Sequence, residues 1–314
     1  MRSKKSGPGN ASSIDTPAAV ALVVTLLPWA SAFAGIRAGL EGFSPGALVL
    51  FRFLIACAGL IVYAAITRMR LPALRDLPAM FLLGFAGITV YQVCLTFGEQ
   101  SVSAGTASFL VATVPCFTAL LAFFFLRERL SRLGVVGILV SFLGVAIISF
   151  GGSGGFSFTP GALLVVLASF SESIAFIMQK RFMPRYSGLQ LATYMMWTGT
   201  IFMLVFTPEL LRELPTAPLS ATLAIVYLGI FPAAISYVTW SYTLSRIPAS
   251  TATSFLNLSP LLALLISWLW LREIPTVLEI AGGIVVIVGV LIVNTRGKAR
   301  TLVEPLGREE ARVL

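Results

Sequence analysis

"AGTASFLVATVPCFTALLAFFFLRE" (104–128) and "ASTATSFLNLSPLLALLISWLWLRE" (249–273) are two versions of one pattern in the same chain. Each begins with small and hydroxyl-bearing residues, contains a proline near its middle, and ends on an apolar run closed by Leu-Arg-Glu. Pro115 aligns with Pro260 and Glu128 with Glu273, both at an offset of 145 residues. Self-similarity at a constant offset indicates internal duplication.

The same offset extends into the neighbouring segments. It places three glycines of the first half on glycines of the second: Gly84 on Gly229, Gly137 on Gly282 and Gly144 on Gly289. Because the offset is unchanged across three apolar segments, we predict two homologous halves.

The composition indicates the environment of the chain. Of its 314 residues, 57% are hydrophobic and only 11% are charged, whereas a soluble domain carries about 25% charged residues. Apolar runs of about 20 residues match the hydrocarbon core of a bilayer. We therefore expect an all-α polytopic membrane protein with the lipid bilayer as its partner. The formal charge of +9 is taken to report orientation in the membrane, and no nucleic acid partner is expected.

Apolar runs bounded by charged residues, proline and glycine predict ten transmembrane helices, five in each half. The expected spans are 17–40, 45–67, 77–98, 103–126, 133–150, 160–179, 189–207, 219–243, 249–271 and 276–294. The predicted organisation is a tail (1–16), a first repeat (17–150), a linker (151–159), a second repeat (160–294) and a tail (295–314). A cleaved signal peptide is an alternative for the first span, but the repeat requires this helix.

The basic residues predict the orientation. With the N-terminus in the cytoplasm, 18 of the 22 lysines and arginines fall on the cytoplasmic side and three fall outside. This positive-inside bias places both tails in the cytoplasm. Because each half holds an odd number of helices, the second half is then inserted upside down. Inverted repeats of this kind recur in secondary transporters, which bind substrate near the membrane midplane between the repeats.

Several kinds of chemistry are disfavoured. The chain has no histidine, and its three cysteines lie in apolar runs without a CxxC motif, which argues against a Ser-His pair, a zinc site and a disulfide framework. The two aspartates, Asp15 and Asp76, lie outside the spans, and no GxxxxGK[ST] motif occurs. We expect no enzyme, no catalytic residue, no metal and no cofactor.

Glu172 is the acidic residue placed deepest in a span, and it shares a helix face with Ser169. A charge at the bilayer centre costs about 3 kcal/mol on insertion scales, so such residues usually face a cavity or a partner. The predicted substrate-binding residues are Trp29, Tyr91, Gln92, Thr113, Ser169, Glu172, Tyr237, Trp240 and Asn257. Pro115 and Pro260 are predicted gating elements, because proline interrupts both spans at equivalent positions.

Structural roles are the alternatives for these residues. Glu172 could form an ion pair or stay protonated, the aromatic residues could pack in the core or at the interface, and the hydroxyls could bond to the helix backbone.

The stretch "LPWASAFAGIRAGLEGFSPGALVLFRFLIA" (27–56) is similar to the opening helix pair of EamA-type members of the drug/metabolite transporter superfamily. The midspan prolines and Leu-Arg-Glu endings of the fourth and ninth spans resemble the same family. The resemblance covers all ten spans. In that family Arg52 and Glu273 match motif positions, which we assign mainly to structure, whereas Phe170 stands where a tryptophan is usual.

The resemblance implies a ten-helix exporter of small metabolites, foremost amino acids, in the bacterial inner membrane. Its central cavity would be lined by helices 1, 3, 4, 6, 8 and 9, and alternating access would carry the substrate across. Other metabolites, drugs and a channel-like facilitator remain alternatives. The oligomeric state stays open, with a monomer sufficient for transport.

Overall fold

The computed structural model describes residues 16–125, 131–150, 159–246, 255–256 and 258–296. Every regular element within these ranges is helical. The first half contains α1 (Thr16–Gly39), α2 (Pro45–Ile66), η1 (Leu74–Asp76), α3 (Leu77–Gly84), η2 (Phe85–Val90), α4 (Tyr91–Gly98), α5 (Ala104–Val111), α6 (Val114–Phe125) and α7 (Arg132–Phe150). The second half contains α8 (Pro160–Gln179), α9 (Gly188–Met203), η3 (Leu204–Phe206), α10 (Thr207–Glu213), α11 (Leu219–Leu228), η4 (Gly229–Ile235), α12 (Ser236–Arg246), α14 (Ser259–Leu271) and α15 (Val277–Arg296).

Eight helical stretches of the described chain are long and apolar enough to cross a membrane. They are Thr16–Gly39, Pro45–Ile66, Leu74–Gly98, Ala104–Phe125, Pro160–Gln179, Gly188–Glu213, Leu219–Thr243 and Val277–Thr295. Two shorter apolar helices, Arg132–Ile148 and Ser259–Leu271, lie where the fifth and ninth spans are expected. The prediction of an all-α polytopic membrane protein is confirmed at the level of eight spans, and the count of ten stays a prediction.

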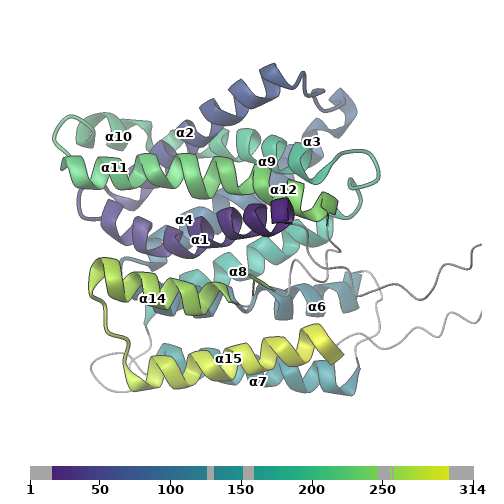
Figure 1. The fold of residues 1–314 in the computed structure, drawn as a ribbon, viewed down its shortest axis with the longest axis vertical. Helices are drawn as coiled ribbons and strands as arrows, with labels where there is room; N and C mark the ends of the chain where they lie inside the picture. Colours follow the sequence, from purple (N-terminus) through teal and green to yellow (C-terminus); the bar gives the residue numbers. More distant parts are fainter. Residues whose placement is uncertain (1–15, 126–130, 151–158, 247–254, 257, 297–314) are drawn as a thin grey trace, which may run out of the picture.

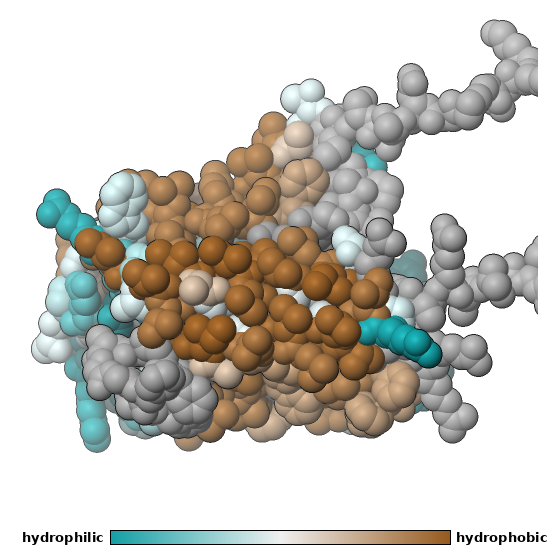
Figure 2. Space-filling model, turned by 90° about the horizontal axis from the view of Figure 1, so that it is seen from below, coloured by the Kyte–Doolittle hydropathy of each residue, from teal (hydrophilic) through white to brown (hydrophobic). Residues whose placement is uncertain are grey.

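The surface agrees with a membrane setting. Figure 2 shows hydrophobic side chains gathered in a broad band across one face, with hydrophilic residues toward its two ends. Large apolar side chains are exposed on several helices, for example Leu139 on α7 and Ile284 on α15. In water such a surface would be unfavourable, whereas lipid tails solvate it.

The helices lie roughly side by side in layers (Figure 1). α7 and α15 form one outer layer, and α5 and α6 contact α15. α1 packs against α11, α12 and α14, as expected for a first span that belongs to the fold. α1 begins and α15 ends on the same side of the molecule, at the right in Figure 1.

The two halves repeat each other's irregularities. α7 begins at Arg132 and α15 at Val277, which is the offset of 145 residues seen in the sequence. The third span widens into the π-helix η2 from Phe85, and the eighth widens into the π-helix η4 from Gly229. A π-helical turn is rare and is often found at functional sites, so its presence at matching positions supports duplication of the whole unit.

Glycines let α7 and α15 approach closely. A Cβ added at Gly137 would lie 2.8 Å from the carbonyl oxygen of Gly289, and one added at Gly144 would lie 2.7 Å from that of Gly282. The partners run in opposite directions along the two helices, so the helices are antiparallel. Small residues at such contacts allow tight packing in membranes.

The midspan proline of the fourth span follows a break rather than a kink in a continuous helix. α5 ends at Val111 and α6 begins at Val114, so Pro115 is the second residue of α6. Pro260 likewise occupies the second position of α14. At the start of a helix the missing N–H of proline costs little, because that group would have no helical partner. Pro28 is different, since α1 stays helical through it.

Candidate functional site

A buried arginine lies in the interior between α2 and α4. Arg52 is only 5% exposed, and its Nη1 donates to Oε1 of Gln92 at 3.2 Å. Its Nε has no hydrogen-bond partner among the described residues. Gln92 is itself buried and neutral. A guanidinium without an anionic partner is costly to bury, and it is therefore a candidate anion-binding group.

Glu172 contributes a carboxyl group to the same region. It lies on α8, and its Oε2 has no hydrogen-bond partner among the described residues. This oxygen would be 3.5 Å from a Cβ added at Gly87, so the carboxyl lies against η2. The prediction that Glu172 is a deep carboxyl agrees with this position, and within the described chain it forms no ion pair.

Two tyrosines lie near both Arg52 and Glu172. Tyr91, the first residue of α4, and Tyr237 on α12 each lie within range of both Arg52 and Glu172. Both side chains are half-buried. Arg52, Gln92, Tyr91, Glu172 and Tyr237 therefore form one group, which we call the central polar group. It combines a guanidinium, a carboxyl, an amide and two phenol hydroxyl groups in a low-dielectric interior.

Aromatic side chains border this group. Trp29 on α1 meets Tyr237 edge-on with ring centroids 5.7 Å apart, and its ring centre is 5.5 Å from that of Trp240. The indole Nε1 of Trp29 donates to the carbonyl of Pro232 in η4 at 3.0 Å. Trp29 thus connects the first span to the π-helical turn of the eighth span. The structure brings Trp29, Tyr237 and Trp240 together, as the sequence suggested.

Two of the predicted site residues instead stabilise the break in the fourth span. Ser169 is fully buried and donates to the carbonyls of Leu110 at 3.2 Å and Val165 at 3.0 Å. Thr113 is also fully buried, and its hydroxyl donates to Leu110 at 2.6 Å. These contacts fit the alternative of backbone hydrogen bonding, since both hydroxyls donate to the carbonyl of Leu110 beside the break. Asn257 lies outside the described residues.

Similar contacts brace the π-helix of the third span. Ser171 on α8 donates to the carbonyl of Ala86 in η2 at 2.8 Å. Trp29 makes the matching contact to η4 from the first span. In both halves a side chain from the first helix of the opposite repeat donates a hydrogen bond to the widened turn. Each π-helical turn is therefore held by a specific contact from the other repeat.

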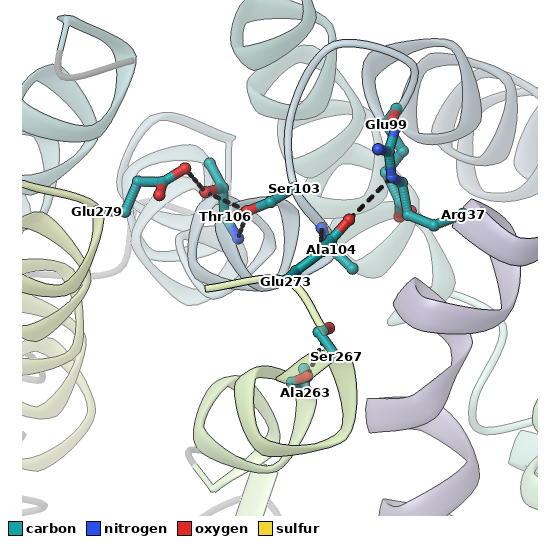
Figure 3. Close-up of polar contacts among 9 residues, drawn as sticks. All are labelled: Arg37, Glu99, Ser103, Ala104, Thr106, Ala263, Ser267, Glu273 and Glu279. Atoms are coloured by element: carbon teal, nitrogen blue, oxygen red, sulfur yellow. Dashed lines mark hydrogen bonds and ion pairs between the residues drawn. The ribbon is translucent and has the colours of Figure 1, made fainter. Parts of the chain in front are cut away.

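A second polar cluster lies at one end of the molecule, and we define it as the Arg37 cluster: Arg37, Glu99, Ala104 and Glu273 (Figure 3). The Nε of Arg37 lies 3.2 Å from Oε1 of Glu273. Its Nη1 donates to the backbone carbonyl of Glu99 at 2.6 Å. Oε2 of Glu273 accepts from the backbone N–H of Ala104, the first residue of α5, at 3.0 Å.

Glu273, which the resemblance assigned mainly to structure, joins separate parts of the fold. It joins the segment after α14 to the end of α1 and to the N-terminus of α5, where a carboxylate is favoured by the helix dipole. Beside it, Thr106 donates to Glu279 at the start of α15 (Figure 3). Four elements from both halves are thus tied together by a few polar groups.

Glu99 was not predicted from the sequence. It follows directly after the span Leu74–Gly98, is 0% exposed, and neither carboxylate oxygen has a hydrogen-bond partner in the described chain. Burial raises the pKa of the Glu99 carboxyl well above its usual range, although Arg37 and Arg52 act in the opposite direction. Its position at the end of a span was the one available sequence signal, and it did not reveal the burial.

An apolar pocket of about 310 Å³ lies between α2 and the η4–α12 segment. Its lining includes Ile55, Gly59, Leu60, Tyr63 and Val238. It reaches Thr239, which is hydrogen-bonded to Thr25 at 2.7 Å. This space lies beside the first and eighth spans, whose contacts include the aromatic residues described above.

The sequence resembles known transporters over most of its length. A family profile described as "EamA-like transporter family" matches residues 16–150 and 159–295. "Uncharacterized transporter YdfC" of Bacillus subtilis (strain 168) is 49% identical over 263 residues, covering 83% of this chain and 86% of that protein. "Probable terminal-alkyne amino-acid exporter" of Streptantibioticus cattleyicolor is 40% identical over 280 residues, covering 89% and 94%.

Two further comparisons concern location and fold. "Uncharacterized inner membrane transporter YedA" of Escherichia coli (strain K12) is 30% identical over 296 residues, covering 91% of this chain and 94% of that protein. A solved crystal structure at 20% identity superposes with a TM-score of 0.59 over 88% of this chain and 95% of that one. At this identity the likeness concerns the fold alone.

The family profile matches both halves of the chain. This agrees with the duplication and with the helical membrane architecture. The expectation of a transporter rather than an enzyme is confirmed by the relatives. The chain belongs to the EamA-like transporter family, within the drug/metabolite transporter superfamily.

Proposed function

We propose that the protein exports amino acids across the bacterial cytoplasmic membrane by alternating access about the central polar group. The observation that carries this proposal is the pair of ionisable groups Arg52 and Glu172, each within electrostatic range of Tyr91 and Tyr237 and each with a buried polar atom that has no hydrogen-bond partner among the described residues. An amino-acid zwitterion carries the two complementary charges. A substrate of this kind would offset the cost of burying both groups.

Each member of the group then has a role. Glu172 binds the substrate ammonium, and Arg52, held by Gln92, binds the carboxylate. This extends the role of Arg52 beyond the structural one expected from the sequence. Trp29, Tyr237 and Trp240 contact the substrate side chain, so an apolar or aromatic side chain is favoured. Ser169 and Thr113 support the site by holding the helix break next to Pro115.

The relatives support the substrate class. A protein 40% identical to this chain carries the printed description of a probable amino-acid exporter. The central polar group lies between helices of both repeats, where transporters of repeat architecture bind substrate.

Ten helices in two inverted repeats provide the mechanism. The contacts between α7 and α15 support inversion, because Gly137 meets Gly289 while its repeat-equivalent Gly282 meets Gly144. This exchange of equivalent partners is expected for two antiparallel helices related by a two-fold axis perpendicular to them. Such an axis in the membrane plane allows one half to move against the other.

Orientation follows from the basic residues. The bias of lysine and arginine places both termini in the cytoplasm and the Arg37 cluster on the periplasmic side. In the described structure that cluster is tied by the Arg37–Glu273 ion pair. We therefore assign it to the outer side of the transport path, with Pro115 and Pro260 beside the moving breaks.

Counterflow by purified protein in liposomes tests this function. Vesicles loaded with one unlabelled amino acid should take up the labelled form transiently and saturably, and the scan should cover the common amino acids and several cationic drugs. Saturable counterflow of drugs without amino acids would refute the substrate class. Conductance without saturation would indicate a channel-like facilitator instead.

A further inference from the structure

The Arg37 cluster contains a carboxyl, that of Glu99, which makes no hydrogen bond within the described part of the chain. Both carboxylate oxygens of Glu99 are buried and without partners among the described residues. The backbone carbonyl of the same residue nevertheless accepts a hydrogen bond from Arg37 at 2.6 Å. Arg37 therefore lies beside Glu99 while its side chain pairs with Glu273 (Figure 3).

The groups around Glu99 come from several elements. Arg37 on α1, Arg52 on α2 and Glu273 after α14 are the charged groups that act on it, and Tyr91 on α4 is a titratable group within electrostatic range. α5 contributes no ionisable residue, and neither does the first half of α8, which packs against Gly98. A carboxylate without a hydrogen-bond donor is much costlier to bury than the neutral acid. The arrangement therefore suits a protonated Glu99.

We propose that Glu99 is a proton-binding site whose protonation closes the outer side of the transporter. In the closed arrangement neutral Glu99 leaves Arg37 paired with Glu273, and Glu273 holds the N-terminus of α5 through Ala104. When this side opens, water reaches Glu99 and the carboxyl loses its proton to that water. The resulting carboxylate competes with Glu273 for Arg37, which opposes reclosure.

This inference rests on the proposed function in one respect, namely that the protein opens on this side during transport. The proton is taken from the outer solution on closure and returned to it on opening. Protonation of Glu99 therefore sets the balance between the two states and does not by itself move protons across the membrane.

The sign follows from the burial. The closed state holds Glu99 with a pKa raised by burial, whereas an exposed glutamate titrates near about 4.3. Closure is thus favoured most below about pH 4.3 and is progressively lost as the pH rises toward the raised value. Between these two pKa values, the release of one proton on opening changes the ratio of closed to open states by about tenfold per pH unit.

Cysteine accessibility measures this balance without any substrate. Ser267 on α14 is 2% exposed and lines a small pocket with Ser103 and Glu273. Ser267→Cys would report opening in a background where Cys57, Cys94 and Cys116 are replaced by alanine. A membrane-impermeant maleimide is applied from the periplasmic side between pH 5 and 8, and each rate is divided by that of the denatured protein at the same pH.

The relative labelling rate should rise roughly tenfold or more from pH 5 to pH 8 in the reporter protein. Glu99→Gln should keep the low rate of pH 5 throughout, within about twofold, because its neutral amide cannot ionise. Glu99→Asp should retain the pH dependence. Glu41→Gln is the matched control, since Glu41 is an exposed carboxyl in the connection after α1.

A Glu99→Gln variant with the pH profile of the reporter protein would overturn the proposal. A reporter protein that labels from the periplasm at the same rate at every pH would also overturn the proposal. A reporter protein that does not label at any pH would do the same. These outcomes are separate from the proposed function. Loss of amino-acid counterflow with intact pH-dependent labelling would refute the substrate class alone, and counterflow with pH-independent labelling would refute only the role of Glu99.

Discussion

Glu172→Gln is expected to weaken transport of amino acids while the protein keeps its fold. The glutamine has nearly the same size as glutamate, and the unpaired Oε2 of Glu172 loses no protein hydrogen bond on substitution. The change removes the charge that binds the substrate ammonium. A hydrogen bond to a charged group is worth about 1.5–3 kcal/mol, which corresponds to a weakening of about tenfold to a hundredfold in apparent affinity.

The assay is concentration-dependent counterflow in proteoliposomes, with the amount of folded protein checked by gel filtration. N-acetyl amino acids provide the matched control, because they keep the carboxylate and the side chain but lack the ammonium group. Any transport of these analogues should be unaffected by Glu172→Gln. We also expect the variant to flatten a dependence of transport on pH between 5 and 8. An unchanged KM for amino acids and an unchanged pH profile would show that Glu172 is structural.

Two further sets of variants test the helix packing and the helix breaks. Gly144→Leu should destabilise the protein by about 1–3 kcal/mol, because a Cβ there lies 2.6 Å from the backbone nitrogen of Val286. Gly59→Ala, whose Cβ would lie 3.6 Å from Ala234, should leave the thermal unfolding temperature nearly unchanged. Equal unfolding temperatures for the two variants would contradict the packing argument. Pro115→Ala and Pro260→Ala should each slow counterflow while expression stays largely intact, and loss of folded protein in both would assign these prolines a purely structural role.

The sequence predicted the repeat and most of the fold because those depend on local features. Apolar length determines which segments can cross a bilayer, and the constant offset of 145 residues relates Pro115 to Pro260 without knowledge of their contacts. The π-helices could not be predicted in this way. Neither Gly87 nor Pro232 implies a widened turn until the neighbouring helices provide donors such as Ser171 to its carbonyl groups.

The candidate site was predicted in part. Trp29, Tyr237 and Trp240 were identified as midspan aromatic residues, and the structure brings them together. Ser169 satisfied the same criterion but donates to the carbonyl of Leu110 on another helix and to that of Val165 on its own, because the periodicity of a helix gives its faces and not the identity of the neighbour. Glu99 was missed for a related reason, since burial of a residue at the end of a span depends on how the connecting segments pack.

The opposite orientation of the two repeats is the central claim, because alternating access about a site between them requires it. Impermeant maleimide labelling of single cysteines in cysteine-free protein tests it directly. Ser153→Cys in the linker and Pro215→Cys should label in intact spheroplasts, whereas Arg70→Cys and Arg300→Cys should label only after the membrane is permeabilised. A Ser153→Cys that labels only after permeabilisation would place the linker on the same side as Arg70, from which an odd number of predicted spans separates it, and would contradict the inverted arrangement.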